Sequence, residues 1–407
     1  MSMKRYVKLN PLTLLLLLIS VLAYGCGNND NHEKVYSKNP EKISYIKITN
    51  DGSSEVGFNV VVDGKPFFTK VDDIITEISN MPSDHSLEPF HRKIWVSFTK
   101  EPFHRKLWRY LIKNRYHFDP YTGAYWGHSP VLYLNSLGFG YCDDVAAVYY
   151  ALATRFGYKA RIWDLHGSDS TTGHNVPEVL VNNHWEMYDP DMEVYYWNKT
   201  GQIAGLEELG EYRELITSPI HPLPVTHFSA PVVTSDDPPI PFAYTELVAD
   251  IYSSGNRRIE PDYYNQADVP QYAHPFTLPP KAYLEFPVPI KQGRKLLSCL
   301  GTEVPDYDLM RLVLPKGWSG SVKFPLVFLA IKGSGKISLN KSVYDLDSLV
   351  MADHLNRDGY IYQASIKESF SDIEILFLVN KKRFDLGNIS GFKIRSKDSN
   401  MLTVVYK

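Results

Sequence analysis

One stretch decides the fold of this 407-residue chain: Gly138-Phe139-Gly140-Tyr141-Cys142-Asp143-Asp144-Val145-Ala146. Its two glycines give the backbone freedom in the approach to the cysteine. Apolar residues then recur at helical spacing as far as Phe156, and Gly157 supplies a stop signal. The pattern therefore predicts a buried helix whose first turn carries Cys142.

A cysteine at a helix start is a candidate nucleophile. The unpaired backbone N–H groups and the dipole of the first turn favour an anion, so a thiol there becomes more acidic. Asp143 and Asp144 suit a helix start, but their negative charge opposes thiolate formation. Since a single Cys in such a place is more often a small buried hydrophobic residue, catalysis by Cys142 requires a base.

Downstream of this helix the sequence predicts a β-hairpin. Residues 176–181 are apolar and rich in β-branched side chains, and Asn182-Asn183 is typical of a two-residue turn. Residues 184–188 would return as the partner strand. Pro177 cannot donate to a strand ladder, which indicates an edge strand or irregular pairing at that point.

The hairpin places a base next to a carboxylate. If Val181 faces His184, side-chain alternation puts His174 and Asp189 on the same face. As diagonal cross-strand neighbours they would lie roughly 7–8 Å apart at the backbone. A carboxylate so placed can orient an imidazole and stabilise its charged form. We therefore expect Cys142, His174 and Asp189 to act as nucleophile, base and orienting acid.

Several motifs in this region, taken in order, resemble the transglutaminase-like superfamily. They are Gly140-Tyr141-Cys142-Asp143-Asp144-Val145-Ala146, Gly157-Tyr158-Lys159-Ala160-Arg161, His174 with Glu178-Val179, and Trp185-Glu186-Met187-Tyr188-Asp189-Pro190. The resemblance implies a papain-like core with a Cys–His–Asp triad in this chain order. It therefore assigns Cys142, His174 and Asp189 the same three roles. The family commonly has an aromatic residue two positions after the histidine, where this chain has Val176.

Two other interpretations of these residues are open. His174, His184 and Asp189 could be metal ligands, although no compact Cys/His spacing supports a metal site. Cys142 could form a disulfide with Cys299. With three cysteines in the chain, the favoured hypothesis is one lipidated cysteine, one functional thiol and one buried thiol.

The N-terminus has the pattern of an export signal. Basic residues precede an apolar run at positions 12–23 that is too short to span a bilayer comfortably. The segment resembles a bacterial lipoprotein signal, which would be removed as residues 1–25 and leave Cys26 as the lipidated end of a polar tether at 26–40. Ala23-Tyr24-Gly25 would also suit an ordinary signal peptidase, in which case the protein would be secreted.

A short repeat begins at Glu88-Pro89-Phe90 and again at Glu101-Pro102-Phe103. Each copy predicts a short amphipathic helix that starts near its proline. Positions 91–115 hold eight Arg or Lys and one Glu. This excess indicates either a surface for anionic polymers or lipid headgroups, or a solvated helix face with its own acidic neighbours. The net charge of the whole chain, −3, implies no general affinity for nucleic acid.

An acyl-transfer site also needs a group that stabilises the oxyanion. In cysteine enzymes of this fold, a polar side chain upstream often joins the backbone N–H of the cysteine in this role. Trp126, His128 and Asn135 are the candidates that precede Cys142.

The remaining chain separates by composition. We expect a small β region at 41–85, with Asp63-Gly64 as a turn, and the transglutaminase-like domain at 86–218. Fourteen of the 27 prolines lie between 219 and 289, so residues 219–290 are expected to be a linker or covering segment. Short strands separated by turn signals predict a β-sandwich at 291–407.

Together these features predict an α+β protein, with a papain-like or transglutaminase-like catalytic core followed by a C-terminal β-sandwich. The expected activity is cysteine-dependent acyl transfer on the amide bonds of a protein, peptide or peptidoglycan-type substrate in the cell envelope. The expected location is the membrane, through a lipid anchor, and no cofactor or resident metal is expected. The alternative is a non-catalytic envelope binding protein that uses the same fold as a scaffold.

Overall fold

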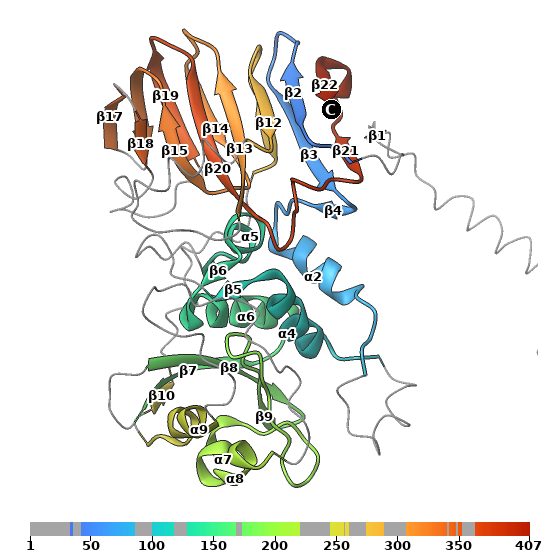
Figure 1. Ribbon diagram of the computed structural model, residues 1–407, viewed down its shortest axis with the longest axis vertical. Coiled ribbons are helices and arrows are strands. Elements are labelled where there is room, and N and C mark those ends of the chain that lie inside the picture. The colour runs from blue at the N-terminus through green and yellow to red at the C-terminus, as the bar shows by residue number, and fades with distance from the viewer. Residues whose placement is uncertain are drawn as a thin grey trace, which may run out of the picture.

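The computed structural model shows a mixed α+β fold with several antiparallel sheets and a strand-rich C-terminal half (Figure 1). This confirms the α+β class expected from the sequence. The structure describes residues 33–35, 42–85, 100–117, 128–167, 173–219, 245–255, 257–259, 274–288, 307–339, 342–346, 349–351 and 363–407.

Three sheets form the strand-rich part of the molecule, which is drawn at the top of Figure 1. The largest has the strand order β18 (Leu349–Met351), β15 (Phe328–Lys332), β20 (Ile373–Asn380), β13 (Tyr307–Leu314), β12 (Tyr283–Phe286), β2 (Ile46–Asn50) and β22 (Leu402–Tyr406). A second has the order β14 (Gly320–Lys323), β19 (Gln363–Ser369), β16 (Gly335–Leu339) and β17 (Ser342–Leu346). The third has the order β1 (Glu33–Val35), β21 (Phe392–Arg395), β3 (Val56–Val62) and β11 (Phe276–Leu278), with β4 (Lys65–Pro66) paired to β3. The strands expected near 310, 330, 364, 376 and 404 are all present.

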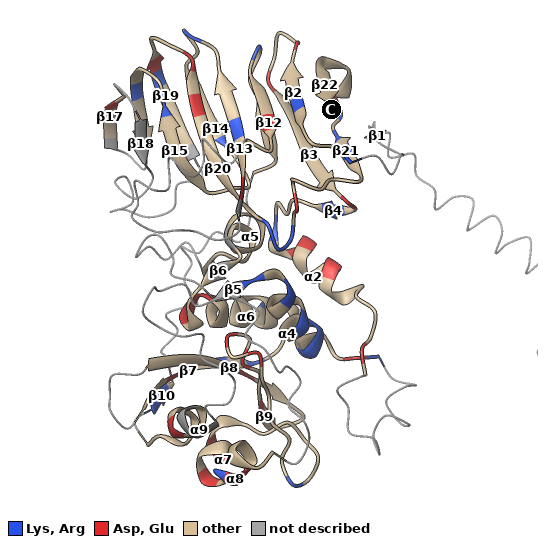
Figure 2. Cartoon of the chain, viewed as in Figure 1, with Lys and Arg blue, Asp and Glu red and all other residues tan. Residues whose placement is uncertain are grey.

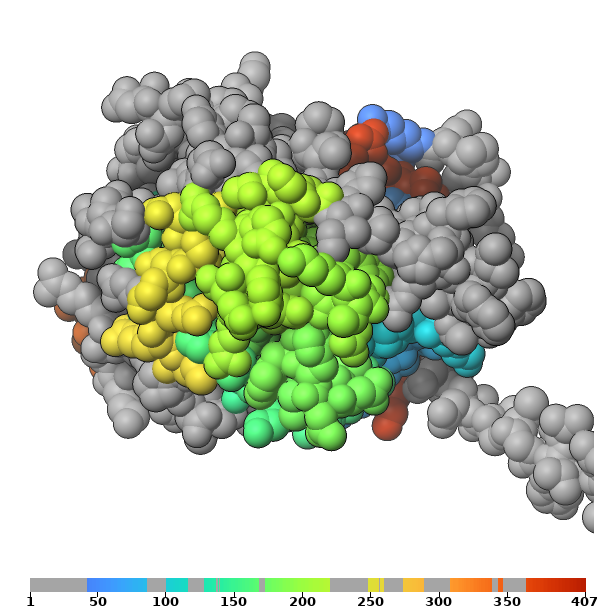
Figure 3. Space-filling view, turned by 90° about the horizontal axis from the view of Figure 1, so that it is seen from below, coloured from blue at the N-terminus to red at the C-terminus, as the bar shows by residue number. Residues whose placement is uncertain are grey.

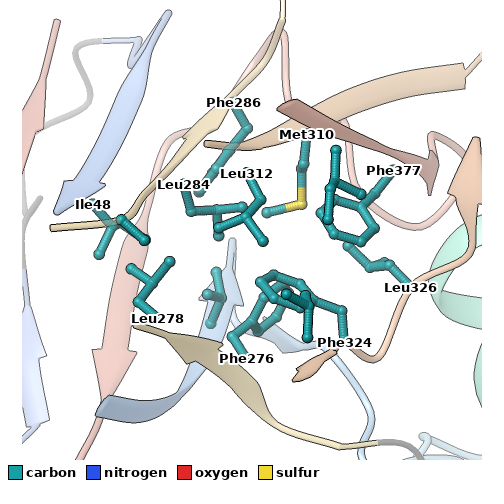
Figure 4. Close-up of a cluster of buried hydrophobic side chains, with 14 of the residues drawn as sticks. Ile48, Phe276, Leu278, Leu284, Phe286, Met310, Leu312, Phe324, Leu326 and Phe377 are labelled. Carbon is teal, nitrogen blue, oxygen red and sulfur yellow. The ribbon is translucent and has the colours of Figure 1, made fainter. Parts of the chain in front are cut away.

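These three sheets share one hydrophobic core. Alternate residues of β2 point inward, so Ile46 and Ile48 are fully buried. Figure 4 shows Ile48 together with Leu284, Leu312 and Phe377, which come from three other strands of the seven-stranded sheet. Burying one such side chain contributes about 1.5–3 kcal/mol, so the core is the main source of stability for this part.

The N-terminal strands belong to the same sheets as the C-terminal strands. Asp63 and Gly64 form the expected turn, with φ angles of 49° and 78°, and lead from β3 into β4. Strand β2 pairs with β12 and β22, whereas β3 pairs with β11 and β21. The region at 41–85 therefore shares its sheets with strands from the far end of the chain.

A layer of helices lies beneath the strand-rich part (Figure 1). It contains α2 (Val71–Ser79), α4 (Phe103–Asn114), α5 (Pro130–Leu132), the π-helical turn η2 (Tyr133–Leu137) and α6 (Cys142–Phe156), with the short parallel pair β5 (Tyr116–His117) and β6 (Phe139–Gly140). Helix α4 is the second copy of the repeat, and its expected apolar face is buried through Phe103, Leu107 and Leu111. The first copy lies outside the described residues.

Basic residues lie along α4 (Figure 2), and two of their side chains have partners close by. Arg109 donates to both carboxylate oxygens of Glu101, at 3.0 and 2.6 Å. Lys106 donates to the backbone oxygens of Ser79 and Met81, at 2.9 and 2.6 Å. Two basic side chains of α4 thus bind a carboxylate and backbone carbonyls of the protein itself.

A four-stranded antiparallel sheet lies on the other side of the helical layer (Figure 1). Its strand order is β10 (Arg257–Ile259), β7 (Ala160–His166), β8 (Gly173–Val181) and β9 (His184–Met187). Three short helices cover it: α7 (Leu206–Glu211), α8 (Glu214–Thr217) and α9 (Thr245–Ser253).

The last described helical turn, η6 (Ser399–Met401), belongs to the strand-rich part and precedes β22.

Two buried amides fasten the helical layer to the strand-rich part. Asn135 accepts the backbone N–H of Phe68 at 3.0 Å and donates to the carbonyls of Phe68 and Pro325, at 2.8 and 2.9 Å. Asn380 at the end of β20 donates to the carbonyls of Asn114 and Leu134, both at 3.0 Å. The segment that leads into α6 is therefore fixed against the end of β20.

Two expectations fall largely outside the described residues. The signal segment at 1–25 and Cys26 lie there, and within the described part of the chain no helix is long and apolar enough to cross a bilayer. The proline-rich stretch 219–290 is described in part. Its α9 and β10 lie on the four-stranded sheet, whereas β11 and β12 belong to the strand-rich part.

Candidate active site

Cys142 is the first residue of α6, as predicted. The preceding Tyr141 is extended, and its backbone N–H donates to Asp144 Oδ2 at 3.1 Å. The helix closes at Gly157, whose φ of 112° is typical of a helix C-terminus. The thiol therefore sits in the first turn, where backbone N–H groups have no partner within the helix.

The two glycines before Cys142 are required by close approaches of the chain. Gly138 has a φ of 60°, and a Cβ there would collide with the side chain of Asn380. A Cβ at Gly140 would collide with the carboxylate of Asp144. The glycines thus permit both the contact with β20 and the acidic cap of the helix.

The hairpin has the predicted turn and register. Asn182 and Asn183 have φ angles of 50° and 63°, as a type I′ turn requires, and Val181 pairs with His184. The ladder between β8 and β9 ends after the pair Glu178–Met187. The next residue of β8 is Pro177, which lacks a backbone N–H, although its carbonyl accepts from the N–H of Tyr188 at 3.3 Å. Pro177 also pairs with Ile162 of β7, so β8 is an interior strand and not the edge strand considered from the sequence.

Asp189 lies just beyond the end of β9, where a tight turn holds its carboxylate. Its backbone pairs with Val194, with N···O distances of 2.9 and 3.0 Å. The N–H groups of Asp191 and Met192 both donate to Asp189 Oδ1 at 2.8 Å. The indole N–H of Trp108 donates to the carbonyl of Asp189 at 2.9 Å. The side chain of Asp189, which is fully buried, is thus fixed on one oxygen and leaves the other for the site.

His174 lies between Asp189 and Cys142. Its Nε2 donates to Asp189 Oδ2 at 2.5 Å. The Cys142 sulfur and a ring nitrogen of His174 lie within 4.8 Å of each other, and the thiol contacts the ring. Because Nε2 is bound to Asp189, Nδ1 is the nitrogen left to exchange a proton with the thiol. The structure therefore places the cysteine predicted from the helix start close to the histidine and the aspartate predicted from the hairpin.

The electrostatics of the site favour a charged imidazole. Burial lowers the pKa of His174, but the carboxylate of Asp189 and the contact with Cys142 outweigh it and raise this pKa well above its ordinary value. A protonated ring beside a thiol stabilises the thiolate, which is the nucleophilic form of cysteine.

A further acid, Asp191, lies within 4.8 Å of both the Cys142 sulfur and a His174 ring nitrogen. It forms a buried ion pair with Arg115, whose Nη2 also donates to the backbone oxygen of Asp191 at 3.3 Å. An uncompensated carboxylate there would oppose thiolate formation, so Arg115 offsets that charge. The pattern Asp189-Pro190-Asp191 was visible in the sequence, but nothing pointed to Arg115.

Asp143 and Asp144 lie beside His128, whose Nε2 is 4.0 Å from Asp143 Oδ2 and 3.6 Å from Asp144 Oδ1. Burial, followed by the charge of Asp143, raises the pKa of Asp144 to about 8. Burial lowers the pKa of His128 to about 4. At neutral pH, Asp144 is therefore mostly protonated and His128 neutral, so the acidic pair opposes the thiolate less than two full charges would.

The three oxyanion candidates have different positions. Asn135 uses its side chain for the junction with Phe68 and Pro325. His128 lies next to the acids at the start of α6. Trp126 falls outside the described residues. The backbone N–H of Cys142, at the first position of the helix, is the donor that the described geometry provides.

The metal ligands considered from the sequence have other neighbours. His184 Nε2 donates to the carbonyl of Ile203 at 2.7 Å, and His174 and Asp189 bind each other. In the described part of the chain, two other groups have donor atoms within 4.8 Å of one another: Cys142, His174 and Asp191; and His128, Asp143 and Asp144. Cys299, the other half of the disulfide considered above, lies outside the described residues.

No family model matches this chain, and a search of curated proteins gives no significant match. The functional interpretation therefore depends on the geometry of the site.

Proposed function

We propose that this protein is a cysteine-dependent acyltransferase or hydrolase that acts on amide bonds. Cys142 would be the nucleophile, His174 the general base and Asp189 its orienting acid. One observation carries the proposal: the imidazole of His174 contacts the Cys142 thiol and also donates to Asp189 Oδ2 at 2.5 Å. Nucleophile, base and orienting acid in such an order form the arrangement required for covalent catalysis.

The chemistry follows from these positions. The Cys142 thiol transfers its proton to His174, and the sulfur attacks the amide carbonyl carbon, forming an S–C bond. The carbonyl oxygen becomes an oxyanion near the first turn of α6, where backbone N–H groups stabilise negative charge. His174 then protonates the leaving nitrogen as the C–N bond breaks, which gives a thioester and a free amine.

The second half of the reaction decides the class of product. Attack of water on the thioester makes the protein a peptidase or amidase, and attack of a primary amine makes it a cross-linking transferase. In both cases His174 accepts the proton of the attacking group and returns it to the Cys142 sulfur. The substrate class we propose is a protein, peptide or peptidoglycan-type amide in the cell envelope.

The proposal extends to the fold and the location. A cysteine at the start of a helix, packed on an antiparallel sheet that carries the histidine, with the aspartate just beyond the end of β9, supports a papain-like, transglutaminase-like domain at 86–218. The three sheets around one core support a β-sandwich in the strand-rich part. From the sequence, we propose that lipidation of Cys26 anchors the protein to a membrane of the cell envelope.

The experiment is intact-mass analysis after treatment with an electrophilic thiol probe. The wild type should gain one fast adduct at mildly acidic pH. Cys142→Ala should lose this adduct, and His174→Ala should keep the site but form the adduct slowly, with the pH profile of an ordinary thiol. If Cys142 reacts like a free thiol whether or not His174 is present, the enzyme hypothesis is wrong and the scaffold alternative is the better one.

A further inference from the structure

A segment from the proline-rich stretch lies directly on the candidate active site. It consists of α9 and β10, residues 245–255 and 257–259, and we call it the strap. Strand β10 pairs with β7 and forms the edge of the four-stranded sheet. Ser253 accepts from Arg213 at 2.9 Å, and Arg257 donates to the carbonyl of Leu206 at 3.0 Å. In Figure 3 the strap, in yellow, borders the yellow-green residues that follow β9.

The strap buries one side chain, Tyr252, against the His174–Asp189 pair. The Tyr252 hydroxyl donates to Asp189 Oδ2, the same oxygen that accepts from His174 Nε2. Its ring is stacked on the imidazole, with the centroids 6.0 Å apart and the planes 25° apart. Tyr252 is fully buried, so water does not compete for these contacts.

These contacts complete the set of donors around the Asp189 carboxylate. Oδ1 accepts the N–H groups of Asp191 and Met192, and Oδ2 accepts from His174 and Tyr252. An ionised carboxylate has about four lone-pair sites, so the hydroxyl fills the last one. Burial and the charge of Asp189 raise the pKa of Tyr252 well above its ordinary value, so the hydroxyl keeps its proton and remains a donor.

We propose that Tyr252 is a positioning residue for the base, and that the strap is therefore part of the catalytic unit. The hydroxyl fixes the carboxylate of Asp189 and draws part of its charge away from His174, while the ring holds the plane of the imidazole. This inference rests on the proposed function, because it assigns a role in that reaction. Nothing in the sequence around Tyr252 predicts this role, because it depends on a contact with Asp189, which is 63 positions away in the chain.

The test replaces the hydroxyl alone and measures His174 directly. The full chain, labelled with ¹³C-histidine, is titrated by NMR as wild type and as Tyr252→Phe, and His174→Gln identifies the signal. Without the hydroxyl, Asp189 retains more charge for the imidazolium, so the midpoint of His174 should rise by roughly half to one pH unit, the equivalent of one hydrogen bond. Alkylation of Cys142 at neutral pH should slow about two- to tenfold, as orientation is lost.

The matched control is Tyr149→Phe, which removes another fully buried hydroxyl, the donor to the carbonyl of His104. It should leave the His174 midpoint and the alkylation rate unchanged, whatever it does to stability. The inference is overturned if the His174 midpoint in Tyr252→Phe equals that of the wild type. It is also overturned if Tyr252→Phe and Tyr149→Phe slow the alkylation of Cys142 equally. Failure of the proposed function has a different signature, because alkylation of Cys142 would then ignore His174→Ala while the effect of Tyr252 on His174 persisted.

Discussion

Replacing Asp189 with asparagine tests the geometry of the site, because asparagine is isosteric but cannot accept on both sides. Asp189 receives two donors on each oxygen: Asp191 N–H and Met192 N–H on Oδ1, and His174 Nε2 and the Tyr252 hydroxyl on Oδ2. An asparagine side chain has one acceptor oxygen and one NH₂ group. In either orientation its NH₂ group faces two donors, so two buried donors lose their acceptor.

The expected cost follows from that count. A buried donor left without a partner costs about 1–3 kcal/mol, so Asp189→Asn should lower the free energy of unfolding by roughly 2–6 kcal/mol. This is a large part of the 5–15 kcal/mol typical of a folded protein. The matched control is Asp72→Asn, which removes a carboxylate that also accepts twice, from Arg155 at 2.9 and 3.1 Å, but is half exposed. Solvent screens such an exposed pair, so the control should change the free energy of unfolding little.

The measurement is urea unfolding followed by tryptophan fluorescence at pH 7, with wild type, Asp189→Asn and Asp72→Asn side by side. A difference of 2 kcal/mol or more between the two variants is expected from the reasoning above. If Asp189→Asn is no more destabilising than Asp72→Asn, the carboxylate is not held between the two pairs of donors. The orienting role assigned to Asp189 would then have to be abandoned.

Three further outcomes are expected. Relative to the wild type, Asp144→Asn should have its highest free energy of unfolding at high pH. The folded-state pKa of Asp144, about 8, lies above its unfolded value, so the stability that the wild-type carboxyl contributes is full below about pH 4 and is lost as the pH rises through 8. Urea unfolding at pH 5 and 8 should therefore show the variant gaining on the wild type at pH 8, and a constant difference would contradict it. Asn135→Ala should lower the unfolding free energy by about 2–5 kcal/mol, since buried backbone groups lose their partners, whereas the exposed Asn388→Ala should have little effect in the same melts. Metabolic labelling with a lipid precursor should mark the wild type and not Cys26→Ala, and equal labelling of the two would exclude the anchor.

The parts of the site that the sequence predicts are those encoded by local pattern. Helical spacing after Cys142 and the stop at Gly157 define α6 without reference to the rest of the chain. The turn at Asn182-Asn183 fixes the register of the hairpin, and alternation then carries His174 to the face of Asp189. That inference works because only 15 residues separate the two, so few geometries are compatible with the turn.

The parts that the sequence does not predict depend on tertiary contacts. Arg115 reaches Asp191 across 76 residues, and Asn380 reaches Asn114 across 266. No periodicity or turn signal relates such positions, because their distance is set by how the helical layer packs on the sheets. The strap is the clearest case: α9 follows a proline-rich stretch whose composition indicates a linker, yet its apolar face is buried against the four-stranded sheet.

The charges around the thiol show why His174 is expected to control its reactivity. Three of the four nearby acids are compensated: Asp189 by the imidazolium of His174, Asp191 by Arg115, and Asp144 by protonation at neutral pH. The side chain of Asp143 is 44% exposed, so water screens its charge. A positively charged His174 ring, which has a nitrogen within 4.8 Å of the Cys142 sulfur, would then stabilise the thiolate directly. Moving or neutralising that ring should therefore change the thiol more than any substitution among the acids, which is the relation that a nucleophile and its base require.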